Sequence, residues 1–178
     1  MDSFLLNIFE TEIADQCDFA LSAFYGMEYT LSTRDNLFWL YVEAFLSHTA
    51  KVSKLLWTSD LNERVDLRRS LGINDNSPIR DRKLRNHFEH FDTRVEDWAR
   101  ESPNKIFVGR VIADDLEHAV GGVQPKDIIR AYETKTKILV FRGETYDLKP
   151  LLEALKALQV IARKEASIPF WKKGNHTT

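Results

Sequence analysis

The chain has 178 residues, of which 43% are hydrophobic and 29% are charged, with seven glycines and five prolines. This composition excludes collagen-like, disordered and low-complexity proteins, and the length suits one domain of roughly 100 to 200 residues. The formal net charge of −2 gives the chain no overall attraction to nucleic acid.

Two further features of the composition exclude other classes. The longest apolar stretch, residues 37–42, is far shorter than the roughly 20 residues that cross a membrane. A single cysteine, Cys17, excludes an internal disulfide framework and a cysteine-based zinc site. The first residues contain no basic leader, so we expect a cytoplasmic protein with no membrane partner.

The first half of the chain has the residue spacing of amphipathic helices. Apolar residues recur three and four positions apart over residues 4–24, and Gly26 marks the expected end of that helix. A second helix is predicted over residues 32–57, because its first residues are Ser and Thr, whose hydroxyls cap the free amides of a first turn. A short helix over residues 64–71 would end at Gly72.

A long third helix is predicted from the strongest start signal in the chain. Asn76-Ser77-Pro78 places a capping side chain before a proline at the first helical position. The helix should reach about Glu101. Its apolar stripe, spaced three and four residues apart, should face the core: Leu84, Phe88, Phe91, Val95 and Trp98.

The hydrophobic period changes after Pro103. Three segments rich in Ile, Val, Phe and Tyr predict strands over residues 105–113, 127–133 and 137–142, and a last helix follows Asp147. The sequence therefore predicts a mainly α protein, an up-and-down bundle of four or five helices with a small antiparallel β-meander inserted before the last helix. We expect a single domain, with the following parts: residues 1–166 overall, a helical core at 1–101 and 147–166, a β insertion at 105–146, and a flexible tail at 167–178.

Charge is distributed unevenly along the chain. Residues 1–50 hold eight acidic residues against one arginine, whereas residues 64–85 hold seven basic residues against three acidic ones. This asymmetry is typical of a local anion-binding surface on a nearly neutral protein. The alternative is a solvated face whose charges form ion pairs within the chain.

Residues 85–92, in the middle of the predicted third helix, read Arg-Asn-His-Phe-Glu-His-Phe-Asp. Histidine can accept and donate a proton near neutral pH, and arginine can grip two phosphate oxygens. This combination indicates chemistry on a phosphodiester. On one straight helix, however, Arg85 and His90 point about 140° apart, so a single helix aims them poorly at one phosphate.

Other interpretations of this stretch are open at the level of sequence. Arg85 and Glu89 are four residues apart and could form a structural ion pair. His87 and His90 could bind a metal together with Glu89 or Asp92. His87 lies toward the apolar stripe, however, where a packing role is expected. We expect neither a metal nor a cofactor.

The sequence Arg85-Asn86-His87-Phe88-Glu89-His90 resembles the R-x4-H motif of HEPN-domain proteins, in the form in which a polar residue follows the arginine. The likeness covers the motif helix, the two long helices before it and the last helix. It implies an up-and-down bundle that forms homodimers, in which the motif helices of two protomers line one composite cleft. It also implies a metal-independent endoribonuclease of the kind found in toxin–antitoxin and defence systems, with an antitoxin or another protein as partner.

The resemblance implies that Arg85 and His90 are the catalytic pair and that Asn86 assists them. His90 would act as a base on the ribose 2′-hydroxyl or as an acid toward the 5′-oxygen, and Arg85 would hold the phosphate. Three basic residues would track the backbone of single-stranded RNA: Arg80, Arg82 and Lys83. Two neighbours are candidate supporting residues: Glu89 and His87. The alternative is a non-catalytic HEPN-like module that uses the same cleft to bind RNA, a nucleotide or a protein.

Overall fold

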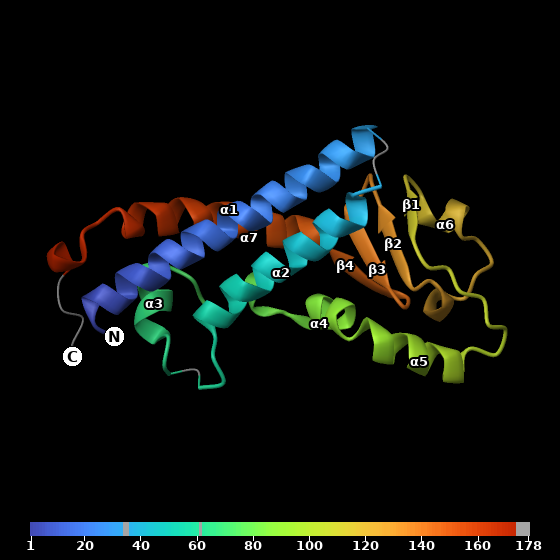
Figure 1. Cartoon of the computed structure of the whole chain (residues 1–178), viewed down its shortest axis with the longest axis horizontal. Coiled ribbons are helices and arrows are strands. Elements are labelled where there is room, and N and C mark those ends of the chain that lie inside the picture. Colours follow the sequence, from blue (N-terminus) through green and yellow to red (C-terminus); the bar gives the residue numbers. More distant parts are fainter. Residues whose placement is uncertain (34–35, 61, 174–178) are drawn as a thin grey trace. The chain divides into compact units, whose positions relative to one another are not determined.

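The computed structural model describes residues 1–33, 36–60 and 62–173. The chain, drawn whole in Figure 1, divides into two compact units. The first unit combines residues 1–85 with the chain from residue 152 onward, and the second comprises residues 86–151. The predicted mainly helical fold, with a small sheet before the last helix, is confirmed.

The first unit is helical throughout. Its longest elements, α1 and α2, are joined by a short connection and are buried along the faces that carry apolar residues three and four positions apart. α7 crosses the boundary between the units and lies mostly in the first one. The elements have these bounds: α1 (Ser3–Thr33), α2 (Phe38–Leu56), α3 (Val65–Ser70), the 3₁₀ turn η1 (Pro78–Arg80), α7 (Leu148–Ala166) and the 3₁₀ turn η3 (Phe170–Lys172).

Gly26 does not end the first helix, as the sequence predicts, because α1 continues through it to Thr33. A Cβ atom at position 26 would lie 2.5 Å from Cδ1 of Tyr41 in α2. The glycine is therefore explained by the close approach of an aromatic ring, and not by a helix end.

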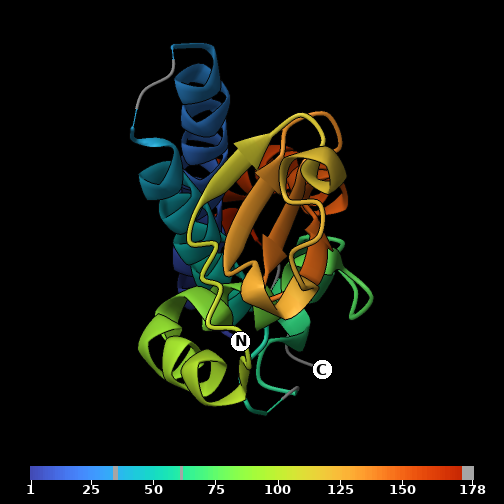
Figure 2. The same cartoon turned by 90° about the vertical axis from the view of Figure 1, so that its right-hand side faces the viewer.

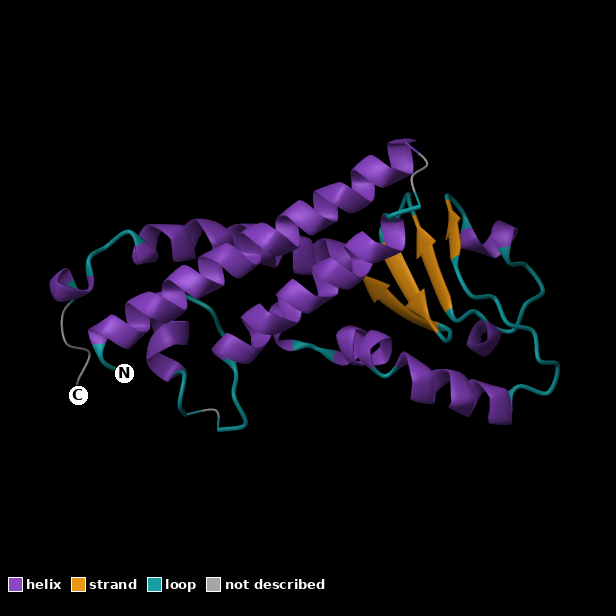
Figure 3. Cartoon of the chain, viewed as in Figure 1, coloured by secondary structure: helices purple, strands orange, loops and turns teal. Residues whose placement is uncertain are grey.

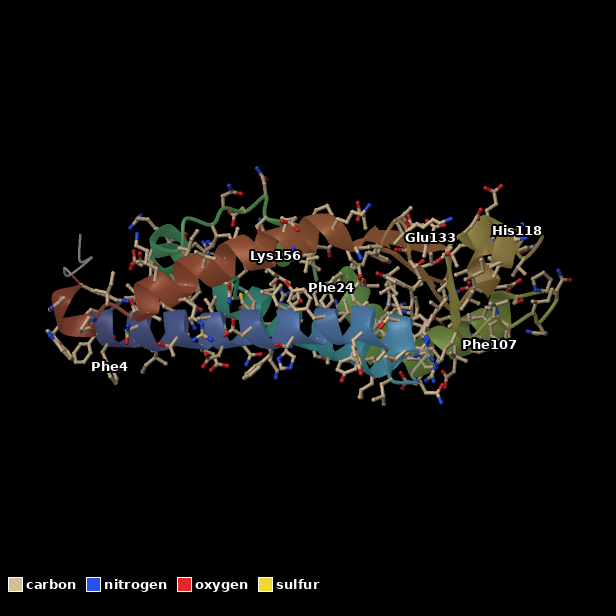
Figure 4. The ribbon with its side chains drawn as sticks, turned by 90° about the horizontal axis from the view of Figure 1, so that it is seen from above. Phe4, Phe24, Phe107, His118, Glu133 and Lys156 are labelled. Atoms are coloured by element: carbon tan, nitrogen blue, oxygen red, sulfur yellow. The ribbon has the colours of Figure 1, made fainter. Side chains whose placement is uncertain are left out.

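The chain after α7 is packed against α1. The side-chain amide of Asn7 donates hydrogen bonds to the carbonyl oxygens of Ala166 (3.1 Å) and Ile168 (3.2 Å). Phe4, near the start of α1, meets the ring of Phe170 edge to face (Figure 4), with 5.3 Å between the ring centroids. These contacts involve part of the segment 167–178 that the sequence predicts to be a flexible tail, and residues 174–178 lie outside the described residues.

A buried ion pair closes this packing. The Lys173 ammonium binds the Glu10 carboxylate, and their side chains are only 6% and 1% exposed. Taking two charges out of water is costly, and their mutual attraction compensates only when they stay together. The segment after α7 thus contacts α1 through charge at Lys173 as well as through the aromatic contact of Phe170 with Phe4.

The second unit is built on a four-stranded sheet with strand order β1-β2-β3-β4 (Figure 3). Helices α4 and α5 precede the sheet in the chain, and α6 lies over one face of it, in front of the strands in Figure 2. The elements have these bounds: α4 (Lys83–Glu89, shared with the first unit), α5 (Phe91–Glu101), β1 (Val111–Ala113), α6 (Leu116–Ala119), the 3₁₀ turn η2 (Pro125–Asp127), β2 (Arg130–Glu133), β3 (Ile138–Phe141) and β4 (Glu144–Asp147).

The predicted antiparallel meander is correct for three of the four strands. β2, β3 and β4 pair antiparallel, with Arg130 opposite Phe141 and Phe141 opposite Glu144. β1 instead pairs with β2 in parallel, because the chain passes through α6 and η2 before it returns to the sheet. The predicted strand over residues 105–113 is regular only over its last three residues, preceded by an isolated bridge between Val108 and Ile128.

Among the residues that the structure describes, none of the helices combines the length and apolar content that a membrane span requires.

Candidate functional site

The predicted helix over residues 78–101 begins with a single 3₁₀ turn. The Ser77 hydroxyl accepts a hydrogen bond from the N–H of Ile79 (3.3 Å), as a cap at this position should. The chain is then extended at Asp81, whose carboxylate accepts the N–H of Lys83 (2.8 Å) and so begins α4. The start signal is therefore genuine, but it opens η1 and not a long helix.

A second interruption falls at His90. α4 ends at Glu89 and α5 begins at Phe91, while His90 has φ −102° and ψ 37°, outside the α-helical range. The axis changes direction between the two helices (Figure 1). The prediction of one continuous helix is wrong here, and the angle of about 140° between Arg85 and His90 on a straight helix does not describe the molecule.

The motif residues are open to solvent to different degrees. Asn86, Glu89 and His90 are exposed, and Arg85 is half-buried. His90 occupies the N-cap position of α5 but makes no capping hydrogen bond through its side chain. Within the described part of the chain, no side chain or backbone group forms a hydrogen bond or ion pair with the His90 imidazole. The ring is therefore accessible to a ligand.

Arg85 lies close enough to Arg82 for the two positive charges to repel each other. Burial and the positive charge of neighbouring Arg82 both lower the pKa of the Arg85 guanidinium. Arginine remains protonated despite such a shift. Two guanidinium groups close enough to affect each other's proton affinity would both attract an anion such as phosphate.

His87 is placed differently from the other motif residues. It is buried, its ring stacks on Phe141 with 4.9 Å between centroids and planes 13° apart, and its Nε2 lies 3.7 Å from Oε2 of Glu144. The predicted packing role of His87 is confirmed. No group of three metal-ligating side chains occurs among the described residues.

The basic segment before the motif is largely engaged in pairs within the first unit. Arg80 NH1 lies 3.7 Å from Oδ1 of Asp75 and donates to the Asp75 carbonyl oxygen at 3.3 Å. The same Asp75 carboxylate accepts the indole N–H of Trp57 (2.7 Å) and lies 3.8 Å from Nε of Arg68. Arg80 therefore has a structural role, whereas Arg82 is half-buried and Lys83 is exposed.

Two titratable groups outside the motif lie in the helical first unit, Cys17 in its core and His48 at a half-buried position. The thiol of Cys17 is fully buried, and burial raises its pKa to about 12. His48 is held at Nδ1 by Oε1 of Gln16 (2.7 Å) and lies against Phe19. Burial and then the charge of Lys51 lower the pKa of His48. Cys17 is the core residue that its helix face predicts, whereas His48 is hydrogen-bonded but only half-buried.

Two cavities lined by described residues lie away from the motif. One of about 410 Å³ lies in the first unit between the loop after α3 and α7, and one of about 350 Å³ lies under α6 in the second unit. The second cavity is lined by Val140 and Thr145, which are opposite each other in the sheet. Since successive side chains of a strand point to opposite faces, this cavity lies on the face away from Phe141 and His87.

Sequence reasoning missed the sheet residues that contact α4. Glu144 and Tyr146 alternate along β4, and the Tyr146 hydroxyl donates to Glu144 Oε2 at 2.7 Å. Their spacing places both on the face that carries Phe141 and His87. This spacing is the only signal in the sequence, and it does not identify the helix that they meet.

No family model, curated protein or solved structure matches this chain.

Proposed function

We propose that this chain is a metal-independent endoribonuclease of the HEPN type, with His90, Arg85 and Asn86 as its catalytic residues. The observation that carries the proposal is the His90 imidazole, which is exposed at the break between α4 and α5 and has no partner among the described residues. A fully buried ring could not reach a substrate. Asn86 is exposed one turn earlier, and His90 donates its backbone N–H to the Asn86 carbonyl oxygen (3.1 Å).

The proposed reaction is an internal transfer on the RNA backbone. His90 takes the proton of the ribose 2′-hydroxyl, the 2′-oxygen forms a bond to phosphorus, and the bond from phosphorus to the 5′-oxygen breaks. The products are a 2′,3′-cyclic phosphate and a 5′-hydroxyl, which receives its proton from an acid. The positive charges of Arg85 and Arg82 stabilise the phosphate oxygens as their negative charge grows.

The proposal includes a homodimer. Each chain supplies one catalytic imidazole, that of His90, whereas the reaction needs both a base and an acid. A second copy of the chain would supply the acid in a composite cleft. We propose single-stranded RNA as the substrate, because a duplex would have to be opened before one of its strands could enter a cleft lined by helices. This activity would suit a cytoplasmic toxin or defence protein that an antitoxin holds inactive.

The test is RNA cleavage in the presence of EDTA. We expect the wild-type chain to cut unstructured RNA and leave a cyclic phosphate, and His90→Ala or Arg85→Ala to reduce the rate by about 10²-fold or more. His118→Ala is the matched control, because His118 is exposed on the four-residue helix α6 (Figure 4). Cleavage that is unaffected in both motif variants would refute the proposal.

The same experiment decides against the binding-module alternative. A non-catalytic module would retain RNA with an affinity that falls as salt rises and would release no cyclic phosphate at any pH between about 6 and 9. That result would leave the motif as a binding surface. If the wild-type chain neither binds nor cleaves RNA, RNA is excluded as the ligand.

A further inference from the structure

The two helices that meet at His90 are both attached to the same sheet. On the α5 side, the indole N–H of Trp98 donates to Oδ1 of Asp127 (2.8 Å), which ends η2 just before β2. Farther along, Arg142 NH2 donates to Glu101 at the end of α5 (2.7 Å). α5 is thus attached to the sheet near its C-terminal end.

On the α4 side, the attachment is made by His87. The His87 ring stacks flat on Phe141 of β3, and its Nε2 faces the Glu144 carboxylate of β4 at 3.7 Å. The same carboxylate oxygen accepts the Tyr146 hydroxyl at 2.7 Å, and the Tyr146 ring meets the His87 ring at a centroid distance of 6.1 Å. Glu144 and Tyr146 therefore enclose the imidazole from the sheet side.

The position of His87 in the helix gives this contact its importance. His87 is three residues before His90, and the backbone N–H of His90 bonds to the carbonyl oxygen of Asn86, next to His87. The His90 imidazole has no partner of its own among the described residues. Its direction is therefore set by the backbone at the break, that is, by how the last turn of α4 is held relative to the start of α5.

We propose that Glu144 and Tyr146 are positioning residues, which act through His87 to fix the direction of the His90 imidazole. This inference rests on the proposed function and extends it, because it assigns the inserted sheet a role in the catalytic site. The sheet holds the turns on both sides of the break, and the exposed His90 ring is presented between them. The energetic basis is pre-organisation, since a displacement of about 1 Å at a reacting group can cost about 10²-fold in rate.

The test uses Tyr146→Phe and Glu144→Gln, with Glu117→Gln as the control. Tyr146→Phe removes only the hydroxyl that orients the carboxylate, and Glu144→Gln removes only the charge. Glu117 is an exposed acid on α6, so its variant makes the same chemical change in the same unit. Two signals are recorded: the ¹H–¹⁵N correlations of the His90 imidazole, and kcat and KM for RNA cleavage in EDTA.

We expect both sheet variants to shift the His90 imidazole signals and to lower kcat by about tenfold, with KM within about twofold of wild type. Glu117→Gln should change neither. A melting curve by circular dichroism identifies any variant that fails to fold. If Glu144→Gln fails to fold, the more conservative Tyr146→Phe alone tests the positioning inference.

The outcomes separate the two proposals. If the wild-type chain does not cleave RNA but Tyr146→Phe still shifts the His90 signals, the proposed function fails and the positioning inference stands. If the wild-type chain cleaves RNA and the sheet variants leave both the His90 signals and kcat unchanged, the positioning inference is overturned and the function stands.

Discussion

The indole N–H of Trp98 donates a hydrogen bond of 2.8 Å to the Asp127 carboxylate, which is fully buried. The two residues join α5, near its C-terminal end, to the turn that precedes β2. A hydrogen bond from the Ser102 hydroxyl and the one from Trp98 lower the pKa of Asp127, against the opposing effect of burial. A carboxylate in this setting stabilises the second unit only while it is ionised.

The first prediction concerns acid stability. Because the pKa of Asp127 is lower in the folded chain than its ordinary value of 3.8, its stabilisation is complete above that value and disappears as the pH falls through the folded pKa. We expect Asp127→Asn to be less stable than wild type near neutral pH and to lose this part of the pH dependence. Urea titrations between about pH 3 and pH 6, followed by the Trp98 indole N–H signal, measure it. Parallel pH profiles for the two chains would contradict it.

The second prediction concerns the contact between Gly26 and Tyr41. Gly26→Ala should destabilise the first unit by up to about 2 kcal/mol, because overpacking costs about 1 to 3 kcal/mol and the gain in helix propensity offsets about 1 kcal/mol of that cost. Ser22→Ala, at an exposed position of α1, is the control and should be slightly stabilising. Urea unfolding followed by circular dichroism measures both. A Gly26→Ala chain as stable as Ser22→Ala would show that the Tyr41 ring moves aside at no cost.

The third prediction separates structural from RNA-facing basic residues. Lys83→Ala should reduce the slope of log K against log salt for single-stranded RNA by about 0.7, the value for one phosphate contact. Arg80→Ala should leave the slope unchanged and lower stability, because Arg80 is paired with Asp75. Fluorescence anisotropy at several salt concentrations and a thermal melt make the distinction. A reduced slope in Arg80→Ala would show that Arg80 leaves Asp75 to bind RNA.

The helices were largely predictable because their signals are local. Apolar residues spaced three and four apart identify α1, α2 and α7, and a run of β-branched and aromatic residues identifies β2 and β3. The turn between β2 and β3 includes Lys137 at φ 61°, and the pairing of Glu133 with Ile138 confirms the predicted hairpin. These helices and this hairpin were predictable because their signals lie within short stretches of the sequence.

The errors have a different origin, since each depends on residues far apart in the chain. Gly26 was interpreted as an end signal because nothing nearby reveals the Tyr41 ring. The parallel pairing of β1 depends on the path of the chain through α6. Local patterns carry no information on such contacts.

The candidate site was predicted in composition but not in shape. The sequence identifies Asn86 and His90 as polar residues, and the structure exposes both. It places them on one straight helix, however, because no residue between Lys83 and Glu101 is a helix breaker such as proline or glycine. The break lies between helices that contact β3, β4 and the turn before β2. Trp98 and its partner Asp127 are 29 residues apart, and His87 lies still farther from Phe141 and Glu144, so helix periodicity does not reveal these contacts.

The discontinuous first unit has a consequence for biosynthesis. Ribosomes make a chain from its N-terminus, so α1 and α2 emerge first, followed by all of residues 86–151, and only then by the segment that binds Asp18 through Gln159 and Glu10 through Lys173. Domains generally fold as units during synthesis. The second unit can therefore be completed while α1 still exposes the surface that α7 will cover. During that interval the helical hairpin of α1 and α2 is unprotected in the nascent chain. This is the stage of synthesis at which the chain most needs a chaperone.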